Sequence, residues 1–489
     1  MGNTSKKLAA KCTLLTKEEQ KHVAATFRAA SRNSDRIRED DLIKFWGPQI
    51  DPRLAQYLTN FLFGSAGNKS STVDFNRFAE LYVYNVRGGN DERMMVLYNS
   101  LGHVYNEATE LPYQLLREYC ESIASTFIKI LKASSSQEAQ MWAKKGFRGK
   151  PGPVQSLGES LAATVSTDEE ATQTYCAARQ LHRWLLSNTL LNQMSESVFI
   201  NLYGIERDEG ESNSPPIFGS VSLLPKPEGL DAFPDYPAFI DLAHIAWLNS
   251  HLPVKHRHKW RFLFSSHIHG ESFSTMAGRI QDQGPSVIII QDNSGYIFGG
   301  YASEAWAIGP NFIGNDGSFL FTLAPKMRLY EATNYNNHYQ YMNHHTKTLP
   351  NGLLMGGQLE FGGIWVNADP FGEGSSADTC ITYRGYKRLS KEPTFRIKSL
   401  EVWGVGDRPL SLKESLMSLS SHSSVLDQRK SDRNFLALMG RQRDNISHPF
   451  TSQDERDESC LDKNPEAKAI LDMAGRTRHS DGIREPPPL

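Results

Sequence analysis

The sequence contains no uninterrupted apolar run near the length of about 20 residues that a membrane-spanning helix requires. Its most apolar stretch, from Val287 to Ile290, is long enough only for a short buried strand. The first residues lack the apolar core of a secretory signal, so we expect no secretory leader. Such a protein would meet a membrane only through an attached group.

Paired cysteines and an excess of basic charge are also missing. The five cysteines, Cys12, Cys120, Cys176, Cys380 and Cys460, are odd in number and form no CxxC pair. This pattern predicts neither a zinc ribbon nor a disulfide framework, and it favours reduced thiols in a cytosolic protein. The formal net charge is -2, whereas nucleic-acid-binding proteins usually carry a basic face. We therefore expect no nucleic-acid partner.

Motifs that would carry catalysis are missing as well. The chain has no G-x-S-x-G elbow, no P-loop and no HExxH zinc motif. His267 and His269 alternate at a predicted strand end, but no cysteine or carboxylate lies at ligand spacing beside them. Glu271 opens a predicted short helix, and a carboxylate in the first turn of a helix is favoured by the helix dipole. No second acid or nucleophile is paired with Glu271 in the sequence. We predict no catalytic residue, no metal ion and no cofactor.

Glycine pairs and tryptophans concentrate in the second half of the chain. The glycine pairs lie in β-rich sequence, outside the strand–loop–helix context of a phosphate-binding loop. We interpret them as tight turns, bulges or close strand approaches, and we expect the tryptophans in the core. The pairs are Gly299-Gly300, Gly356-Gly357 and Gly362-Gly363, and the tryptophans are Trp260, Trp306, Trp365 and Trp403.

The length of 489 residues suits two to four domains of about 100–200 residues each. Residues 14–110 predict a helical module, whose first helix begins with a capping box formed by Thr16 and Glu19. The alternation of helices, polar loops and short apolar segments in this module resembles paired EF-hands.

The two EF-hand-like loops lack the ligands of a calcium site. When Ile37 and Val73 take the eighth loop positions, the twelfth positions are Asp41 and Arg77. A calcium loop needs several carboxylates and a bidentate glutamate at its end. We therefore predict an EF-hand-like fold that binds no calcium. The first, third and fifth positions are Ala30, Arg32 and Ser34 in one loop, and Ala66, Asn68 and Ser70 in the other.

Residues 111–237 predict a helical middle region, with Gly149 to Gln155 as a linker and Leu116, Ile123 and Phe127 on one helical face. From residue 238 to 407 the pattern changes to short strands and glycine-rich turns, which is typical of a sandwich or barrel. Two helices are predicted there, Ile240 to Leu252 and Ser272 to Ile280. The predicted strands are 261–264, 286–291, 296–298, 319–323, 327–330, 363–366 and 395–402, with a hairpin turn at 292–295.

The N-terminal segment, residues 1–13, predicts a lipid anchor. After removal of Met1, Gly2 offers the free amine that N-myristoylation requires, although Lys6 stands where Ser or Thr is usual. One myristoyl chain binds a membrane only marginally, so a second signal is needed. Palmitoylation of Cys12 would be one such signal. The alternative to a lipid anchor is an ordinary frayed terminus. Basic residues facing an anionic membrane would be another signal, and these are Lys6, Lys7 and Lys11.

The C-terminal part is predicted as a disordered serine-rich insert, residues 408–462, followed by a helix and polar tail, residues 463–489. A tethered helix with an apolar stripe and basic residues at its end is suited to docking in a groove on a partner. Packing of the same helix against the β-rich domain is the alternative. The residues concerned are Ile470, Leu471, Met473, Arg476, Arg478 and His479.

Several segments between residues 238 and 407 resemble the TLDc domain family. They are Trp260 to Ser274, Phe298 to Trp306, Gly314 to Phe321, Asn351 to Gln358 with Phe361 to Trp365, and Leu400 to Gly406. The glycine start, the helical half and the closing segment from Arg478 to Glu485 are similar to a branch of this family that is N-myristoylated and associates with mTOR at lysosomes. The resemblance implies a two-sheet β-sandwich flanked by helices, and therefore an α+β chain. It also implies binding to mTOR and to the vacuolar proton-pumping ATPase.

Two hypotheses for function follow. The first is a non-enzymatic interaction protein, cytoplasmic and peripheral on the lysosomal membrane, that supports mTOR signalling. The second is an oxidation-resistance protein or an enzyme acting on oxidants, a property linked to some TLDc relatives. The second hypothesis has little support in the sequence, because Cys380 is the only cysteine in the TLDc-like span and has no visible activating partner.

Overall fold

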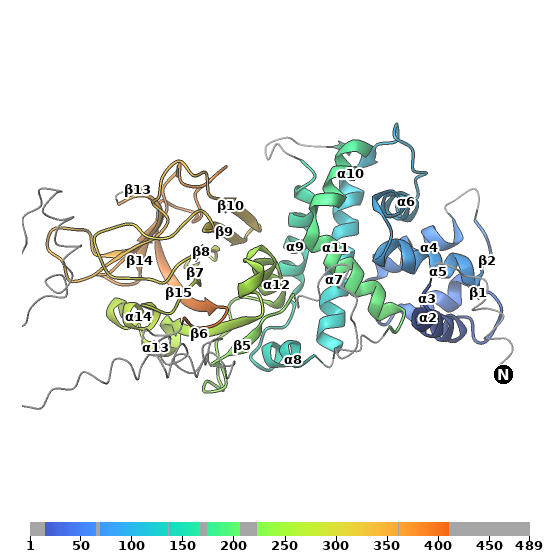
Figure 1. Cartoon of the computed structure of the whole chain (residues 1–489), viewed down its shortest axis with the longest axis horizontal. Helices are drawn as coiled ribbons and strands as arrows, with labels where there is room; N and C mark the ends of the chain where they lie inside the picture. Colours follow the sequence, from blue (N-terminus) through green and yellow to red (C-terminus); the bar gives the residue numbers. More distant parts are fainter. Residues whose placement is uncertain are drawn as a thin grey trace, which may run out of the picture. The chain divides into compact units, whose positions relative to one another are not determined.

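The computed structural model describes residues 15–64, 69–134, 136–166, 174–205, 223–359 and 361–409. Its first half is helical and its second half is built on a large β-sheet (Figure 1), which confirms the predicted α+β class. Several predicted features lie outside the described residues: Gly2 and Cys12, the basic Lys6, Lys7 and Lys11, most of the segment 408–462, and the C-terminal helix with Ile470, Leu471, Met473, Arg476, Arg478 and His479.

The first module is an EF-hand-like pair, as predicted. The capping box at its start is present, because Glu19 N donates to Thr16 Oγ1 at 3.3 Å and Thr16 N donates to Glu19 Oε2 at 2.8 Å. Two very short strands form an antiparallel ribbon in which Ile37 lies opposite Val73, the two residues that the sequence places at equivalent loop positions. The elements are α2(Lys17–Ala30), β1(Ile37–Arg38), α3(Glu39–Trp46), α4(Pro52–Phe63), β2(Thr72–Val73) and α5(Phe75–Val86).

A second unit of the same kind follows, although no local pattern in the sequence indicated it. In this unit a second antiparallel ribbon places Leu111 opposite Cys176. The linker predicted over Gly149 to Gln155 is wrong, because a helix begins at Pro151, and proline suits the first turn of a helix. The elements are α6(Asn90–Ser100), β3(Leu111–Pro112), α7(Tyr113–Ala133), α8(Gln137–Lys144), α9(Pro151–Ala163), β4(Tyr175–Cys176), α10(Ala178–Ser187) and α11(Thr189–Leu202).

The helix α7 is the centre of the second unit. It packs against α9 and α11 (Figure 1). Its predicted apolar face, including Leu116, Ile123 and Phe127, is buried. A Cβ atom at Gly158 of α9 would lie 2.5 Å from the Cα of Glu121, so only glycine allows the two helices to approach this closely. Among the described residues, no helix combines the length and apolar character required to cross a bilayer.

The β-rich half forms two faces that share one long strand, β15(Thr394–Val405). The first residues of β15 pair with β14, whereas its later residues pair with β7 on one side and β6 on the other. Side chains from both faces, such as Ile290, Phe298, Met355 and Val366, form one buried core between them. The predicted two-sheet sandwich is therefore present, as one hydrogen-bonded path in the order β10-β9-β8-β7-β15-β14-β13-β12-β11, with β5 and β6 beside β15.

The hairpin predicted at Asp292 to Gly295 joins β7 and β8. Asp292 N donates to Tyr296 O at 3.0 Å, and Gly295 has a positive φ of 85° that favours glycine. The strands are β5(Lys226–Glu228), β6(Lys259–Ser265), β7(Ser286–Asp292), β8(Ile297–Ala302), β9(Phe319–Ala324), β10(Arg328–Glu331), β11(Tyr341–Asn343), β12(Gly352–Gln358), β13(Phe361–Asn367) and β14(Glu373–Ser375). The accompanying helices are α12(Leu242–His251), η1(Val254–His256), α13(Ser266–His269) and α14(Phe273–Ile280).

Candidate interaction surface and its support

The residues considered for chemistry in the sequence are engaged in ordinary structural contacts. His267 and His269 lie in the short helix α13, so their predicted alternation on a strand is wrong, because the chain leaves the strand after Ser265. His267 Nε2 lies 2.7 Å from Ser399 Oγ, and His269 Nδ1 accepts from Ser265 N at 3.0 Å. Glu271 is exposed and precedes α14. Within the described ranges, no group of three or more His, Cys, Asp or Glu side chains could hold a metal ion.

The described cysteines are buried free thiols. Burial raises the pKa of Cys176 to about 11, and it also raises the pKa of Cys120 and Cys380 above the ordinary value for a thiol. The thiolate is the reactive form of cysteine, so these three residues are weak nucleophiles at neutral pH.

Three of the four predicted core tryptophans are fully buried: Trp260, Trp306 and Trp403. Trp365 is only half-buried, and its Nε1 donates to Asn367 Oδ1 at 2.6 Å. The expectation of a core position is therefore wrong for Trp365, because its ring lies at the edge of the sandwich core.

Three adjoining segments of the sandwich expose large apolar side chains, which we call the loop patch. Tyr335, Phe361 and Ile381 are 85%, 65% and 63% exposed. They belong to three segments: the loop after β10, the start of β13, and the loop after β14. Exposed apolar groups held on rigid loops are a common feature of protein–protein contact sites.

The buried Thr382 connects the loop after β10, the loop after β14 and the end of β12, which pairs with the start of β13. Its hydroxyl donates to Asn336 Oδ1 at 3.0 Å and accepts from Gly357 N at 2.9 Å. Thr333 N also donates to Thr382 O at 2.9 Å, which joins the loop after β10 to the loop after β14. The loop patch is therefore preorganised by backbone and hydroxyl hydrogen bonds.

The pair Gly356-Gly357 permits this arrangement. Both residues have positive φ values, 74° and 82°, and a Cβ atom at Gly357 would lie 2.1 Å from Phe361 O. The prediction that the glycine pairs serve close strand approach is confirmed here, and also at Gly299, where a Cβ would lie 1.9 Å from Ile288 O.

A buried aromatic cluster, the aromatic joint, connects the helical half to the sandwich. Trp142 of α8 lies 5.4 Å from Trp403 of β15 and 6.2 Å from Trp260 of β6, measured between ring centroids. Trp142 Nε1 donates to Pro225 O at 2.7 Å. Tyr236 stacks on Phe147, which follows α8, at 5.6 Å and also contacts Phe262 and Trp403. The members of the joint are Trp142, Phe147, Tyr236, Trp260, Phe262 and Trp403.

A carboxyl group lies inside the aromatic joint. Glu401 is 1% exposed, accepts a very short hydrogen bond from the Tyr236 hydroxyl, and accepts from Trp403 Nε1 at 3.0 Å. Burial raises the pKa of Glu401 to about 7, because it disfavours the ionised form more than the two donors favour it. Glu401 therefore changes charge near neutral pH at the contact between the two halves.

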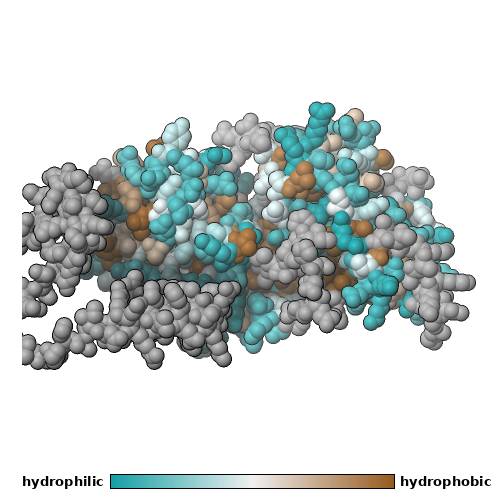
Figure 2. All heavy atoms as spheres, in the orientation of Figure 1, coloured by the Kyte–Doolittle hydropathy of each residue, from teal (hydrophilic) through white to brown (hydrophobic). Residues whose placement is uncertain are grey.

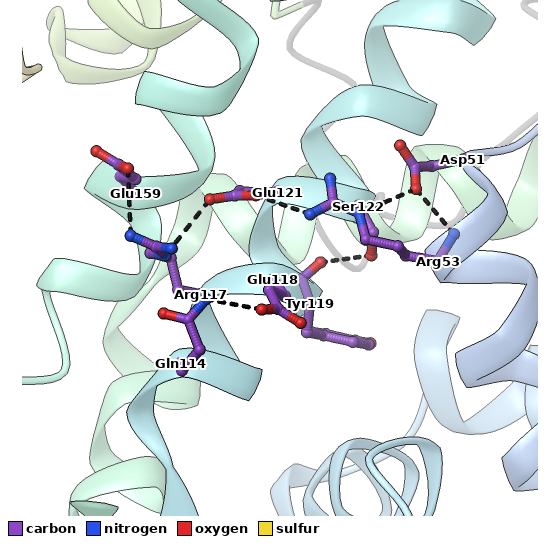
Figure 3. A network of polar contacts seen from close by, with 9 residues as sticks. All are labelled: Asp51, Arg53, Gln114, Arg117, Glu118, Tyr119, Glu121, Ser122 and Glu159. Atoms are coloured by element: carbon purple, nitrogen blue, oxygen red, sulfur yellow. Dashed lines mark hydrogen bonds and ion pairs between the residues drawn. The ribbon is translucent and has the colours of Figure 1, made fainter. Parts of the chain in front are cut away.

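A polar network connects the two EF-hand-like units (Figure 3). Arg53 of α4 donates from Nη1 to Glu121 Oε2 of α7 at 2.8 Å, and from Nε to Asp51 Oδ1 at 3.4 Å. Arg117 Nε lies 3.5 Å from Glu121 Oε1, and Arg117 Nη1 lies 3.5 Å from Glu159 Oε1 of α9. The buried Glu121 thus has an arginine on each side, as a buried carboxylate requires. These contacts connect α4, α7 and α9.

The outer surface is mainly hydrophilic on the face shown in Figure 2, where hydrophobic residues form separate small groups among polar ones. Small groups of this kind are normal for a folded protein. The loop patch differs from them because its three side chains are largely exposed and share one hydrogen-bonded support.

Comparison with known proteins shows a match to the TLDc domain over residues 233–406. Among the similar proteins is "MTOR-associated protein MEAK7" of Gallus gallus, 30% identical over 433 residues, which cover 87% of this chain and 81% of that protein. The protein of the same name from Xenopus laevis is 31% identical over 431 residues, 86% of this chain and 83% of that protein. "Nuclear receptor coactivator 7" of Mus musculus is 29% identical over 178 residues, 36% of this chain and 18% of that protein.

Proposed function

Because this chain belongs to the family of TLDc proteins that includes MTOR-associated protein MEAK7, we propose that it is a non-enzymatic adaptor that associates with mTOR at a membrane surface. The observation that carries the proposal is the similarity to these relatives over more than four fifths of both chains. It extends over the helical half as well as the sandwich, so the whole arrangement is shared and not the TLDc domain alone.

The geometry supports the proposed adaptor role. The two halves meet through a buried aromatic joint, and the sandwich carries the preorganised loop patch. Burial keeps the described thiols protonated, which disfavours the alternative of a thiol-dependent enzyme acting on oxidants. We further propose that the cytoplasmic face of the lysosome is the membrane concerned and that the vacuolar proton-pumping ATPase is a second partner.

Substitutions in the loop patch test the adaptor role. The double variant Tyr335→Ser/Ile381→Ser is expected to reduce the amount of mTOR recovered with the tagged full chain about tenfold, because exposed aromatic and aliphatic anchors often dominate binding free energy. Thermal unfolding of the variant is expected to stay close to that of the parent, since both side chains are exposed.

The matched control is Val254→Ser, which removes an equally exposed apolar side chain from η1. Undiminished recovery of mTOR with the double variant would show that the loop patch is not the contact. No recovery of mTOR with the parent chain from lysosomal membranes would count against the adaptor role itself.

The lipid anchor is tested separately with Gly2→Ala. This variant cannot be N-myristoylated, so we expect it to move from the membrane fraction to the soluble fraction of cell lysates. Cys12→Ser measures the additional contribution of palmitoylation. If Gly2→Ala sediments with lysosomal membranes as fully as the parent, the anchor is not the myristoyl group.

A further inference from the structure

The loop between α2 and α3 borders an open cavity of about 610 Å³ that the adaptor role does not use. This loop is the first EF-hand-like loop, and it lies next to the ribbon of β1 and β2. With Ile37 at the eighth loop position, Arg32, Arg36 and Arg38 fall at the third, seventh and ninth positions. In a calcium loop these positions supply ligands, the seventh through its backbone carbonyl. All three arginines line the cavity.

Two of these arginines take over the electrostatic role of a cation. Asp41, at the twelfth position, is 7% exposed and lies with Oδ1 3.1 Å from Arg32 Nη2 and with Oδ2 2.9 Å from Arg38 Nε. Both oxygens that would chelate a metal ion are therefore paired with guanidinium groups. This pairing gives a physical reason for the prediction that the loop binds no calcium.

The guanidinium groups that line the cavity retain donors beyond those that contact Asp41. A guanidinium has five N–H donors, and the contacts to Asp41 use one donor from each of two arginines. Arg32 and Arg38 are 63% and 68% exposed. Arg36 donates to Thr72 Oγ1 at 3.3 Å, and within the described ranges it has no carboxylate within ion-pair distance. The cavity thus gathers three guanidiniums around one buried, already neutralised carboxylate.

We propose that this cavity binds a phosphate monoester on a polyol-sized molecule. Convergent guanidiniums recognise phosphate oxygens with paired, charge-assisted hydrogen bonds, and a cavity of this size suits a small polar ligand. The Thr72 hydroxyl, which accepts from Arg36, lines the same cavity. Asp35 also lines the cavity and opposes an anion there. The phosphoryl group would come either from a soluble phosphorylated polyol or from a lipid headgroup.

The test uses the full chain with Gly2→Ala as background, so that the anchor does not contribute. Inositol hexakisphosphate is titrated by calorimetry, and vesicles of phosphatidylcholine with and without a phosphorylated inositol lipid are sedimented with the protein. Arg36→Gln is expected to weaken binding about tenfold, the usual effect of losing charge-assisted hydrogen bonds. Asp35→Asn is expected to strengthen binding severalfold because it removes an opposing charge. Arg32 and Arg38 are left in place, since they hold the buried Asp41.

The matched control is Arg384→Gln, an exposed arginine on the sandwich, which is expected to bind like the parent. Binding of the soluble polyol alone supports the site with a soluble ligand, and a gain on vesicles that depends on the phosphorylated lipid supports the site with a lipid headgroup. The proposal would be overturned if the parent bound neither probe. It would also be overturned if Arg36→Gln bound the probes as tightly as the parent. A failure to recover mTOR would not affect these measurements, so the adaptor role and the phosphate-binding cavity are tested independently.

Discussion

Replacing Trp142 by alanine is expected to lower the free energy of unfolding by about 3–5 kcal/mol. Trp142 is fully buried and contacts Phe147, Trp260 and Trp403 in the aromatic joint. The substitution leaves a cavity between α8 and the sandwich, and it leaves the carbonyl oxygen of Pro225 without its indole donor. We expect the helical half and the sandwich to lose their rigid connection as well as stability.

Urea unfolding followed by circular dichroism, together with limited proteolysis, measures both effects. Trp142→Ala is expected to unfold at lower urea and to be cut between the helical half and the sandwich while both remain folded. Trp142→Phe retains part of the ring and should show a smaller loss. Tyr335→Ala, at an exposed position, is the control and is expected to change stability by less than about 0.5 kcal/mol. A single unfolding transition at the parental urea concentration for Trp142→Ala would contradict the assigned role.

Replacing Glu401 by glutamine is expected to stabilise the protein above neutral pH by about 3 kcal/mol and to have little effect near pH 5. The folded pKa of Glu401 is about 7, against 4.5 as its ordinary value. Each pKa unit corresponds to about 1.4 kcal/mol, so the difference predicts the stated magnitude. Glutamine matches the neutral acid, because its oxygen accepts from Trp403 Nε1 and its amide donates to the Tyr236 hydroxyl.

The direction of the pH effect follows from proton binding. Between pH 4.5 and about 7 the folded protein keeps the proton on Glu401, whereas the unfolded chain has released it. The contribution of this carboxyl group to stability is therefore complete below pH 4.5 and is lost progressively as the pH rises from 4.5 through about 7. His244 has the opposite effect, because burial lowers its pKa to about 3 and the unfolded chain binds its proton first as the pH falls below 6.5.

The difference between Glu401→Gln and the parent isolates the Glu401 effect, since His244 is present in both. Urea unfolding at pH 5 and pH 8 measures it, and Glu392→Gln, with an exposed carboxylate, is the control. The same dependence of stability on pH in Glu401→Gln and in the parent would refute the assignment of the neutral-range proton to Glu401.

Features encoded by neighbouring residues were predicted from the sequence. The capping box of Thr16 and Glu19, the helix that ends before Pro253, and the hairpin at Asp292 to Gly295 all appear where their residues indicated. Ile37 and Val73 were both assigned to the eighth position of an EF-hand-like loop, and they form a strand pair in the structure. In paired EF-hands the eighth residues of the two loops lie opposite each other in the ribbon.

Features with weak local patterns were missed. The strand β12 has three glycines among its seven residues and shows little alternation, and β5, β11 and β14 have only three residues each. The second ribbon escaped notice because Leu111 and Cys176 lie far apart in the chain and α8 intervenes. The loop patch was also missed, since isolated apolar residues in loops look the same in a sequence whether they are buried or exposed.

The amino-acid sequence by itself determined the α+β class, the helical EF-hand-like start, the TLDc resemblance and the absence of familiar catalytic motifs. These conclusions depend on residue types at short, regular spacings. Only the tertiary structure decided which distant groups meet: Tyr236 and Glu401 are 165 residues apart, and Trp142 and Pro225 are 83 apart. Burial, and with it the pKa of Glu401, depends on all the elements packed around a group, so no local pattern of residues predicts it.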